Sequence, residues 1–310
     1  MKVLFISSGK NGSVSILVRN QGESLKKKGI EVDYFMIRPG LTGYITSIFK
    51  IRKKYKSDNF DLAHAHYSLS GIVASLAGVC PLIVSLMGSD AYNATLIRQI
   101  TRFFYKNKWN ATIVKTNKMK ELLGFKNSFI LPNGVDLERF NPKNKLLARE
   151  KLKLPFDKKI VLFISVLNRP EKNFDLAKKA VNFLNDEKIE LLRLHNIPNS
   201  EIPDYLNAAE LLLLTSKWEG SVNVIKEAMA CNCPIVATEV GDIKWIIGDT
   251  LGCSLTTFDH KDIAAKILKT LALEKRTNGR DRIIQLGLDS QIIASKLINI
   301  YKLVTSKKMH

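Results

Sequence analysis

Residues 210–240 read ELLLLTSKWEGSVNVIKEAMACNCPIVATEV, in which two short apolar runs flank a helix-like segment. The runs at 210–216 and 233–240 have the composition of buried strands, and they are too short for buried helices. A strand, a helix and a second strand in this order indicate a parallel sheet with covering helices. Residues 210–240 therefore predict an α/β fold.

Two acids stand across the start of the helix in this stretch. Glu219 follows the first strand directly, and Glu227 lies eight residues further on, inside a helix that begins near Val222. An unpaired buried carboxylate is very costly, so we expect polar partners for both. An ionised carboxylate accepts hydrogen bonds from two neighbouring hydroxyls, which suits the ribose diol for Glu227 and a second sugar for Glu219.

A tight turn lies between the two acids. Gly220 and Ser221 precede the helix, and the first N–H groups of a helix have no partner within it. Together with the helix dipole, these groups favour anions or sugar oxygens. A carboxylate that binds a diol, a carboxylate that binds a sugar and a turn that binds anions together indicate a site for a nucleotide sugar.

The alternation of strand and helix extends along the chain. Further strand-like runs stand at 3–7, 32–37, 62–67, 82–87, 111–116 and 128–132, and a second series begins with 160–167 and 189–195. A chain of 310 residues exceeds the usual size of one domain. We therefore expect two Rossmann-like domains, each a doubly wound parallel sheet, facing across a cleft with ligands outside the carboxyl ends of the strands.

The domain boundaries are predicted from residues that interrupt helices and strands. Segment 132–145 is rich in Pro, Gly and Asn, which is typical of a linker. We place an N-terminal acceptor-side domain at 1–142 and a donor-binding domain at 143–294. We expect a C-terminal helix at about 295–310 to pack back on the first domain.

Charge is the strongest signal in the composition. The net charge is +19, and residues 1–150 carry 24 Lys and Arg against 10 Asp and Glu, which gives +14. The first half should therefore face something anionic. In segment 41–59 a basic cluster follows apolar residues at helical spacing, and segment 96–109 mixes cations with aromatic residues. Both patterns suit an anionic membrane and equally suit ordinary solvated helices.

The remaining composition argues for a cytosolic protein. The N-terminal MKVLFISSGKNG has the pattern of a first strand and lacks that of a signal peptide, and no long uncharged apolar run is present. The four cysteines, at 80, 231, 233 and 253, lack the spacing of a zinc site. We interpret them as reduced core thiols.

Several motifs resemble those of one enzyme family. EGSVNVIKE at 219–227 resembles the E-x7-E motif of the retaining family 4 glycosyltransferases, which have the GT-B fold. LPNGVDLERFNP at 131–142 is similar to the segment that closes the first domain in that family, and RPEKN at 169–173 to its phosphate-binding stretch. The resemblance runs essentially from end to end, and it is closest to a branch that makes bacterial surface polysaccharides such as teichuronic acid.

This resemblance implies roles for individual residues. Arg169 and Lys172 would neutralise the diphosphate of the donor and stabilise the leaving nucleoside diphosphate, and Glu219 would position the sugar; these are the predicted catalytic residues. The predicted nucleotide-sugar-binding set is Gly9, Gly12, Gly220, Ser221, Val222, Asn223, Val224 and Glu227. The donor would be a UDP-sugar or another nucleoside diphosphate sugar, with its base near loop 195–203. We expect neither a metal nor another cofactor, because the sequence has no D-x-D motif.

The first domain supplies weaker candidates. Lys10 lies in a loop that follows the first strand, and His66 lies on the same side of its strand as His64. In SLMGSDAY at 85–92, Met87 occupies the position of a histidine found in many relatives. Asp90 remains, either as an acid of the cleft or as a cap for the following helix. We take Lys10, His66 and Asp90 as candidates for contacting acceptor or sugar.

The expected reaction is retaining transfer of a sugar to a glycan or lipid-linked acceptor. The acceptor hydroxyl would attack from the face that the diphosphate leaves, so no protein nucleophile is needed, in contrast to retaining glycosidases. Domain closure would bring segment 9–12 toward Arg169 and Lys172. Three alternatives stay open: a GT-B epimerase or phosphorylase, a basic nucleic-acid-binding protein, and an inactive partner-binding protein. Specific nucleic-acid binding is not expected, because no reading motif is visible.

Overall fold

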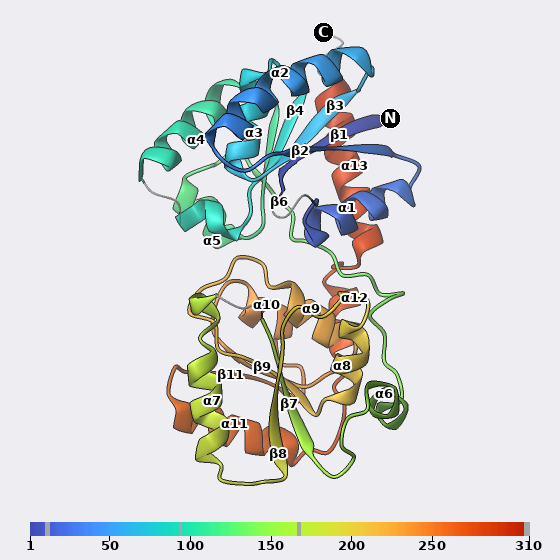
Figure 1. Ribbon diagram of the computed structural model, residues 1–310, viewed down its shortest axis with the longest axis vertical. Coiled ribbons are helices and arrows are strands. Elements are labelled where there is room, and N and C mark those ends of the chain that lie inside the picture. Colours follow the sequence, from blue (N-terminus) through green and yellow to red (C-terminus); the bar gives the residue numbers. More distant parts are fainter. Residues whose placement is uncertain (10–12, 93–94, 166–168, 307–310) are drawn as a thin grey trace. The chain divides into compact units, whose positions relative to one another are not determined.

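The computed structural model describes residues 1–9, 13–92, 95–165 and 169–306 (Figure 1). The chain divides into two compact units. The first comprises Met1–Gly134 together with the chain from Ser290 onward, and the second comprises Val135–Asp289. Both are parallel α/β sheets covered by helices, as the sequence predicts.

The first unit is built on a six-stranded sheet in the order β2-β1-β3-β4-β5-β6. All of its strand pairs are parallel. The strands are β1 Lys2–Ser8, β2 Glu31–Ile37, β3 Leu62–His66, β4 Leu82–Ser85, β5 Ala111–Val114 and β6 Phe129–Ile130. The helices are α1 Ile16–Lys26, α2 Leu41–Ser57, α3 Ser68–Leu76, α4 Thr95–Asn107, α5 Asn117–Leu123 and α13 Ser290–Ser306, with a 3-10 helix at Gly88–Tyr92.

Residue alternation along β1 decides how the helices cover this sheet. Leu4 and Ile6 belong to a core that also contains Ile51 of α2 and Val73 of α3. The side chain of Phe5 points to the opposite face, where α1 packs on α13. Figure 1 shows α13, from the end of the chain, beside α1 of the same unit.

The second unit is built on a five-stranded parallel sheet in the order β11-β10-β9-β7-β8. Its strands are β7 Lys159–Ile164, β8 Ile189–Leu194, β9 Leu211–Leu214, β10 Ile235–Thr238 and β11 Cys253–Thr256. Its helices are α6 Lys145–Leu152, α7 Phe174–Phe183, α8 Ile202–Ala208, α9 Asn223–Ala230, α10 Ile243–Ile247, α11 His260–Leu271 and α12 Gly279–Gln285, with a 3-10 helix at Pro170–Lys172. Helices α7 and α11 pack together over one core.

The structure differs from the sequence analysis at the unit boundaries. The predicted boundaries were 142/143 and 294/295, whereas the compact units change at 134/135 and 289/290. Segment 135–142 belongs to the second unit because Arg280 donates to the carbonyls of Leu137 at 2.9 Å and Phe140 at 2.7 Å. Val135 also forms a parallel bridge with Asp289. The C-terminal helix begins at Ser290 and packs on the first unit.

Two further findings concern strands and cysteines. Strand β11 was not predicted from the sequence, because it is a short, partly exposed edge strand with the mixed sequence CSLT. The cysteines are free thiols, as expected, but Cys80 is exposed and is not a core residue. None of the described helices is long and apolar enough to cross a membrane.

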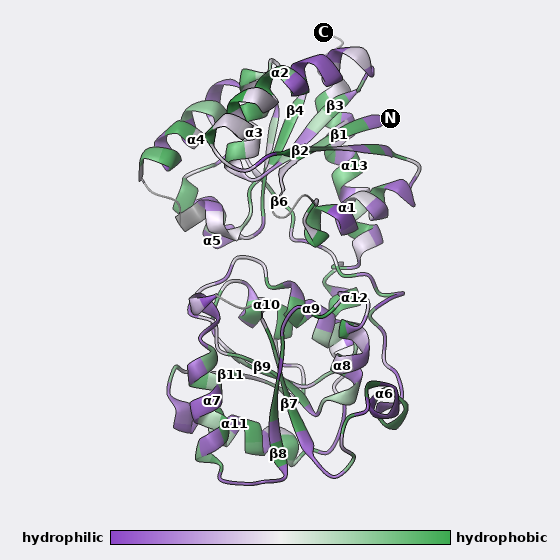
Figure 2. Cartoon of the chain, viewed as in Figure 1, coloured by the Kyte–Doolittle hydropathy of each residue, from purple (hydrophilic) through white to green (hydrophobic). Residues whose placement is uncertain are grey.

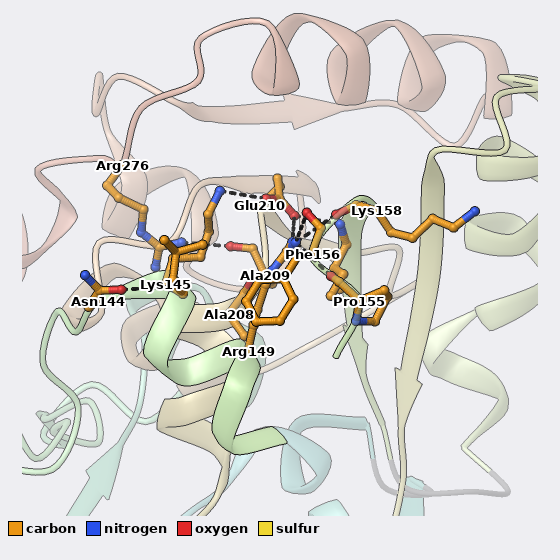
Figure 3. A network of polar contacts seen from close by, with 12 residues as sticks. Asn144, Lys145, Arg149, Pro155, Phe156, Lys158, Ala208, Ala209, Glu210 and Arg276 are labelled. Carbon is orange, nitrogen blue, oxygen red and sulfur yellow. Dashed lines mark hydrogen bonds and ion pairs between the residues drawn. The ribbon is translucent and has the colours of Figure 1, made fainter. Parts of the chain in front are cut away.

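A buried ion pair joins α6 to the amino ends of β7 and β9 (Figure 3). The guanidinium of Arg149 donates to Glu210 Oε2 at 2.6 Å, and the same oxygen accepts the N–H of Ile160 at 2.6 Å. The guanidinium also donates to the carbonyls of Pro155, Phe156, Lys158 and Ala208. All three nitrogens of the buried guanidinium therefore donate hydrogen bonds, which fixes the turn from α6 into β7.

Candidate active site

The predicted donor-site residues lie at the switch point of the second sheet. Strands β8 and β9 lie on opposite sides of β7. The chain therefore runs from β7 to β8 on one side and then crosses to β9 on the other side. The segments after β7 and β9 therefore meet at the carboxyl ends of neighbouring strands, where open α/β sheets bind ligands. Arg169 and Lys172 follow β7, and Glu219 follows β9.

Lys172 and Glu219 form the centre of this site. Lys172 Nζ lies 2.5 Å from Glu219 Oε1, and both side chains are less than a fifth exposed. The same carboxylate oxygen accepts the hydroxyl of Ser216 at 2.8 Å. Thr215 donates to the carbonyls of Lys172 and Asn173 at 3.1 and 2.9 Å. The two segments are thus fixed to each other by side chains from both.

Arg169 lies at the edge of the same site. Its side chain is about half exposed and forms an ion pair with Glu171. The Arg169 guanidinium lowers the pKa of Glu171 against the opposing effect of burial, which keeps this carboxylate ionised. The carbonyl of Glu171 accepts the N–H of Lys217 at 2.8 Å, a second tie between the segments after β7 and β9. Each predicted cation therefore has a carboxylate as its partner, and a bound diphosphate could take the place of that carboxylate.

The predicted anion-binding turn precedes α9, whose first residue is Asn223. The N–H of Val222 donates to Asp242 Oδ1 at 3.0 Å, so this group is already occupied. The N–H groups of Gly220, Ser221, Asn223 and Val224 remain candidates for a ligand. Gly241, with φ +60°, lies against the turn, since an added Cβ would stand 2.3 Å from the carbonyl oxygen of Gly220.

Lys226 is a buried cation that the sequence analysis did not single out. It is fully buried, and its Nζ lies 2.7 Å from Ser221 Oγ and 3.5 Å from Asn223 Oδ1. Burial lowers the pKa of Lys226 to about 8, while the charges of Asp242 and Glu227 oppose this shift. Through these two contacts the ammonium group of Lys226 links α9 to the turn that precedes it. The lysine inside an apolar helical segment was the available signal in the sequence.

Glu227 is partly buried one turn into α9. Burial raises the pKa of Glu227 to about 7, although the charges of Arg139 and Lys226 lower it. Arg139 donates to the backbone and side-chain oxygens of Asn199, in the loop between β8 and α8 where the base is expected. Arg139 is the second residue that sequence reasoning missed, because it lies in the segment assigned to the linker.

In the first unit, the switch point lies between β1 and β3. Gly9 follows β1 and His66 ends β3, so both occupy the expected edge of the sheet. The rings of His64 and His66 stack at 4.4 Å, which confirms that they share one side of the strand. His64 is held by the hydroxyls of Tyr301 at 2.7 Å and Ser85 at 2.8 Å.

His66 differs from His64 in its surroundings. It is fully buried, and neither ring nitrogen has a hydrogen-bond partner within the described chain. Burial, together with the charge of Lys115, lowers the pKa of His66 to about 3, so the ring is neutral. A neutral, unpaired imidazole at the carboxyl end of a strand offers one donor and one acceptor to a ligand hydroxyl, which could reach the buried ring only after the covering side chains move. Lys10 and Gly12 lie outside the described residues.

Asp90 caps α3, which precedes it; the residues directly before the helix that follows, 93 and 94, lie outside the described residues. Its Oδ1 accepts the N–H and the hydroxyl of Ser68 at 2.9 and 2.7 Å, and its Oδ2 accepts the N–H of Met87 at 2.6 Å. Burial raises the pKa of Asp90. Because the chain folds back between α3 and β4, the carboxylate reaches the earlier helix. Met87 is buried and contributes its backbone to this contact.

Both units thus place polar residues at their switch points, and in the second unit two cations, two acids and the N-terminus of α9 lie in the segments that follow β7 and β9. Such a set can bind a phosphate group and the hydroxyls of a sugar. Among the described residues, no three or more His, Cys, Asp and Glu side chains are grouped so that they could hold a metal ion.

The fold is that of known GT-B enzymes. A sucrose-phosphate synthase from Thermosynechococcus elongatus aligns with a TM-score of 0.82 at 19% identity, covering 99% of both chains. The Anabaena protein HepE, solved in complex with UDP and glucose, aligns with a TM-score of 0.76 at 17% identity, covering 97% of this chain and 99% of that one. At this identity the likeness shows the fold alone.

Sequence families identify the class. Residues 6–117 match the family described as glycosyl transferase 4-like, and residues 188–272 match glycosyl transferases group 1. The chain therefore belongs to the glycosyltransferases of GT-B fold with family 4-like domains.

Among its relatives, the chain resembles TuaC of Bacillus subtilis, named as a putative teichuronic acid biosynthesis glycosyltransferase, at 28% identity over 244 residues. It also resembles an Escherichia coli galactosyltransferase that acts on a GlcNAc-diphosphoundecaprenol, at 27% identity over 241 residues. These matches cover 66% and 63% of this chain and 62% of each relative. The chain thus matches less than two thirds of the length of either relative.

Proposed function

We propose that this protein transfers a sugar, with retention of configuration, from a nucleoside diphosphate sugar to a glycan or lipid-linked acceptor in the synthesis of a bacterial surface polysaccharide. The observation that carries the proposal is the Lys172–Glu219 pair at the switch point of the second sheet. Support comes from the family match and from a structural neighbour that binds UDP and glucose. We take UDP as the donor nucleotide to be tested first.

Each site residue has a role in this reaction. Lys172 and Arg169 bind the diphosphate and stabilise its developing charge as the bond to the sugar breaks. Glu219 accepts hydroxyls of the sugar, and Glu227 accepts the ribose diol. The acceptor hydroxyl forms the new bond on the face that the diphosphate leaves, and a phosphate oxygen takes its proton. No metal is required, so activity in excess chelator should equal activity without it.

The proposed acceptor side is the first unit, which carries the larger positive charge. His66 contacts a hydroxyl of the acceptor or sugar, and Gly9 lets the backbone approach it. A lipid-linked acceptor would be presented at an anionic membrane surface, which suits the +14 charge of residues 1–150. The E. coli relative acts on a diphosphoundecaprenol acceptor, which favours this class.

A thermal-shift screen tests donor binding. UDP at about 100 times its dissociation constant is expected to stabilise the protein by about 2.7 kcal/mol. The screen should include UDP, GDP, ADP and CDP with their common sugar derivatives, and the Glu227→Ala variant should lose the shift. Absence of a shift with every nucleotide would refute the proposal. Product analysis separates transfer from an epimerase or phosphorylase, because only transfer consumes a hydroxyl acceptor and releases nucleoside diphosphate.

The affinity for UDP is expected to have an optimum between about pH 7 and pH 8. Raised by burial, the pKa of Glu227 is about 7, so the carboxylate that accepts the ribose diol ionises as the pH rises through this value. With a pKa of about 8, Lys226 loses its positive charge above the optimum, which weakens anion binding at the turn. Titration calorimetry from about pH 6 to about pH 9 measures the rise and the fall of the affinity.

Two variants separate the limbs of this pH profile. Glu227→Gln removes the ionisation, so it should bind UDP weakly and lack the rise toward pH 7. Lys226→Arg keeps a cation at all accessible pH values, so it should lack the fall at high pH. An unchanged profile in either variant would show that the limb belongs to another group.

A further inference from the structure

The outer side of α2 carries a stripe of exposed apolar residues. Leu41, Ile45 and Phe49 recur every four residues, and Leu41 and Phe49 are 79% and 65% exposed. The inner side of the same helix packs through Ile51 into the core of the first unit. The stripe therefore faces away from the sheet. Side chains of this size in a row are uncommon on a solvated surface.

Helix α4 repeats the arrangement. Leu96, Ile100 and Phe103 follow one another at spacings of four and three residues, and Leu96 and Phe103 are 67% and 57% exposed. Thr101 is the buried residue of this helix, and Phe104 packs against the core. Figure 2 shows hydrophobic and hydrophilic residues along both α2 and α4.

These two stripes belong to one layer. Helix α3 packs on both α2 and α4, and all three contribute to the same core over one face of the sheet (Figure 1). Their outer sides therefore point the same way. Helix α3 adds the exposed Leu69 and Leu76, seven residues apart, between the two stripes. We call the outer side of α2, α3 and α4 the helical face.

The charge of the helical face has one sign. Helix α2 contains five Lys and Arg, α4 contains three, and the three helices contain neither Asp nor Glu. Lys54 is paired with Asp33 and Asp58. Lys50, Arg52, Lys53, Lys56, Arg98, Arg102 and Lys106 are exposed, and within the described ranges none has an ion pair. On α2, Lys53 continues the apolar stripe by one further step of four residues.

We propose that the helical face docks on an anionic phospholipid bilayer. Its apolar side chains enter the boundary between headgroups and acyl chains, and its cations lie at the level of the lipid phosphates. The proposal deepens the proposed function, because it names the surface at which a lipid-linked acceptor would be met. Docking itself involves no donor chemistry.

Charge complementarity selects this partner over a second copy of the chain. In a symmetric dimer the same patch lies on both subunits, so the cations of one helical face would oppose those of the other. Like charges brought together at an interface are unfavourable. Nucleic acid would satisfy the cations but leaves no role for three rows of exposed apolar side chains, since its binding is governed by phosphate contacts.

Vesicle flotation tests the docking. The protein should float with phosphatidylcholine vesicles that contain phosphatidylglycerol, and far less with phosphatidylcholine alone. The double variant Lys53→Glu with Lys56→Glu should lower partitioning by at least about tenfold, because each lysine near an anionic surface contributes about fivefold. Leu96→Ser with Phe103→Ser should lower it by at least about tenfold, because it removes the inserted apolar area. High salt should weaken binding.

A matched control lies on α11. Leu268 and Lys269 are exposed neighbours in the second unit, so Leu268→Ser with Lys269→Glu makes comparable changes and should leave partitioning unchanged. Equal loss in this control, or equal binding to neutral vesicles, would overturn the proposal. So would a concentration-dependent dimer in light scattering that Leu96→Ser with Phe103→Ser abolishes, because the helical face would then bind a second copy.

The same variants keep docking and catalysis distinguishable. The thermal shift with UDP should be unaltered in every helical-face variant, because all of the changed residues belong to the first unit and the proposed donor site belongs to the second. Failure to bind anionic vesicles together with a normal thermal shift with UDP would refute the docking proposal alone. Normal vesicle binding together with no thermal shift from any nucleotide would refute the proposed donor chemistry alone.

Discussion

Replacing Lys172 with alanine is expected to lower the turnover of sugar transfer by about 10²-fold or more, the usual loss when a group that stabilises transition-state charge is removed. Two effects combine. The leaving diphosphate loses a cation. Glu219 loses the ammonium group of Lys172, which lies 2.5 Å away, and keeps its hydrogen bond from the Ser216 hydroxyl. Turnover is measured with the nucleotide sugar that gives the largest thermal shift.

Conservative and distant variants control this result. Lys172→Arg keeps the charge and should retain more turnover than alanine, although the guanidinium cannot reproduce the geometry of an ammonium group. Lys179→Ala removes an exposed cation from α7 and should leave turnover unchanged. If Lys172→Ala binds UDP normally and still turns over at the original rate, Lys172 has no part in the reaction.

The fold was largely predictable because the central strands are buried on both faces, and the partly exposed edge strands β2 and β8 still carry apolar runs. Runs such as LLLL at 211–214 are too short for helices and too apolar for loops, and each forms a strand. Strand β11 lacked this signal because an edge strand is partly exposed and needs no continuous apolar run. The unit boundary was predicted too late because Arg280 ties segment 135–142 to the second unit, a contact between residues far apart in the sequence.

The candidate site was predictable to the extent that its residues follow strands directly. Glu219 and Lys172 belong to segments at the carboxyl ends of β9 and β7, and the switch point brings such segments together. The contacts of Lys226 and Arg139 were not predictable. Each depends on a turn or loop whose path the sequence pattern does not specify, and each lies where a different role was expected.

Asp90 shows the same limit in the first unit. Its position before a helix suggested a cap for that helix, because capping is a local pattern. The described contacts show that the carboxylate caps α3 through Ser68, 22 residues earlier. Its second oxygen holds the N–H of Met87, so the substitution of the family histidine by Met87 leaves this backbone contact in place. The role of Asp90 as an acid toward substrate stays a prediction.

Replacing Arg149 with methionine is expected to lower the free energy of unfolding of the second unit by about 3–5 kcal/mol, the usual effect of breaking a buried ion pair. The methionine fills much of the volume but leaves Glu210 Oε2 with only the N–H of Ile160 (Figure 3). Four backbone carbonyls lose their donor as well. Because each unit has its own core, hydrogen exchange should show reduced protection in β7 and β9 and unchanged protection in β1 and β3.

A control on the same helix tests whether burial is the reason. Lys151 is 67% exposed, and its buried partner Asp204 also pairs with Lys143 at 2.8 Å. Lys151→Met should therefore leave stability nearly unchanged, because Asp204 keeps one cation and the lost lysine is solvated.

The double variant Arg149→Met with Glu210→Leu should recover part of the loss, because it removes the carboxylate oxygen that Arg149 had paired; Lys145, which pairs with Glu210 Oε1 at 3.0 Å, loses its partner in return. Equal losses in the Arg149 and Lys151 variants would mean that α6 is stabilised by general packing, and the Arg149–Glu210 pair would then have no special part in holding α6 to the sheet.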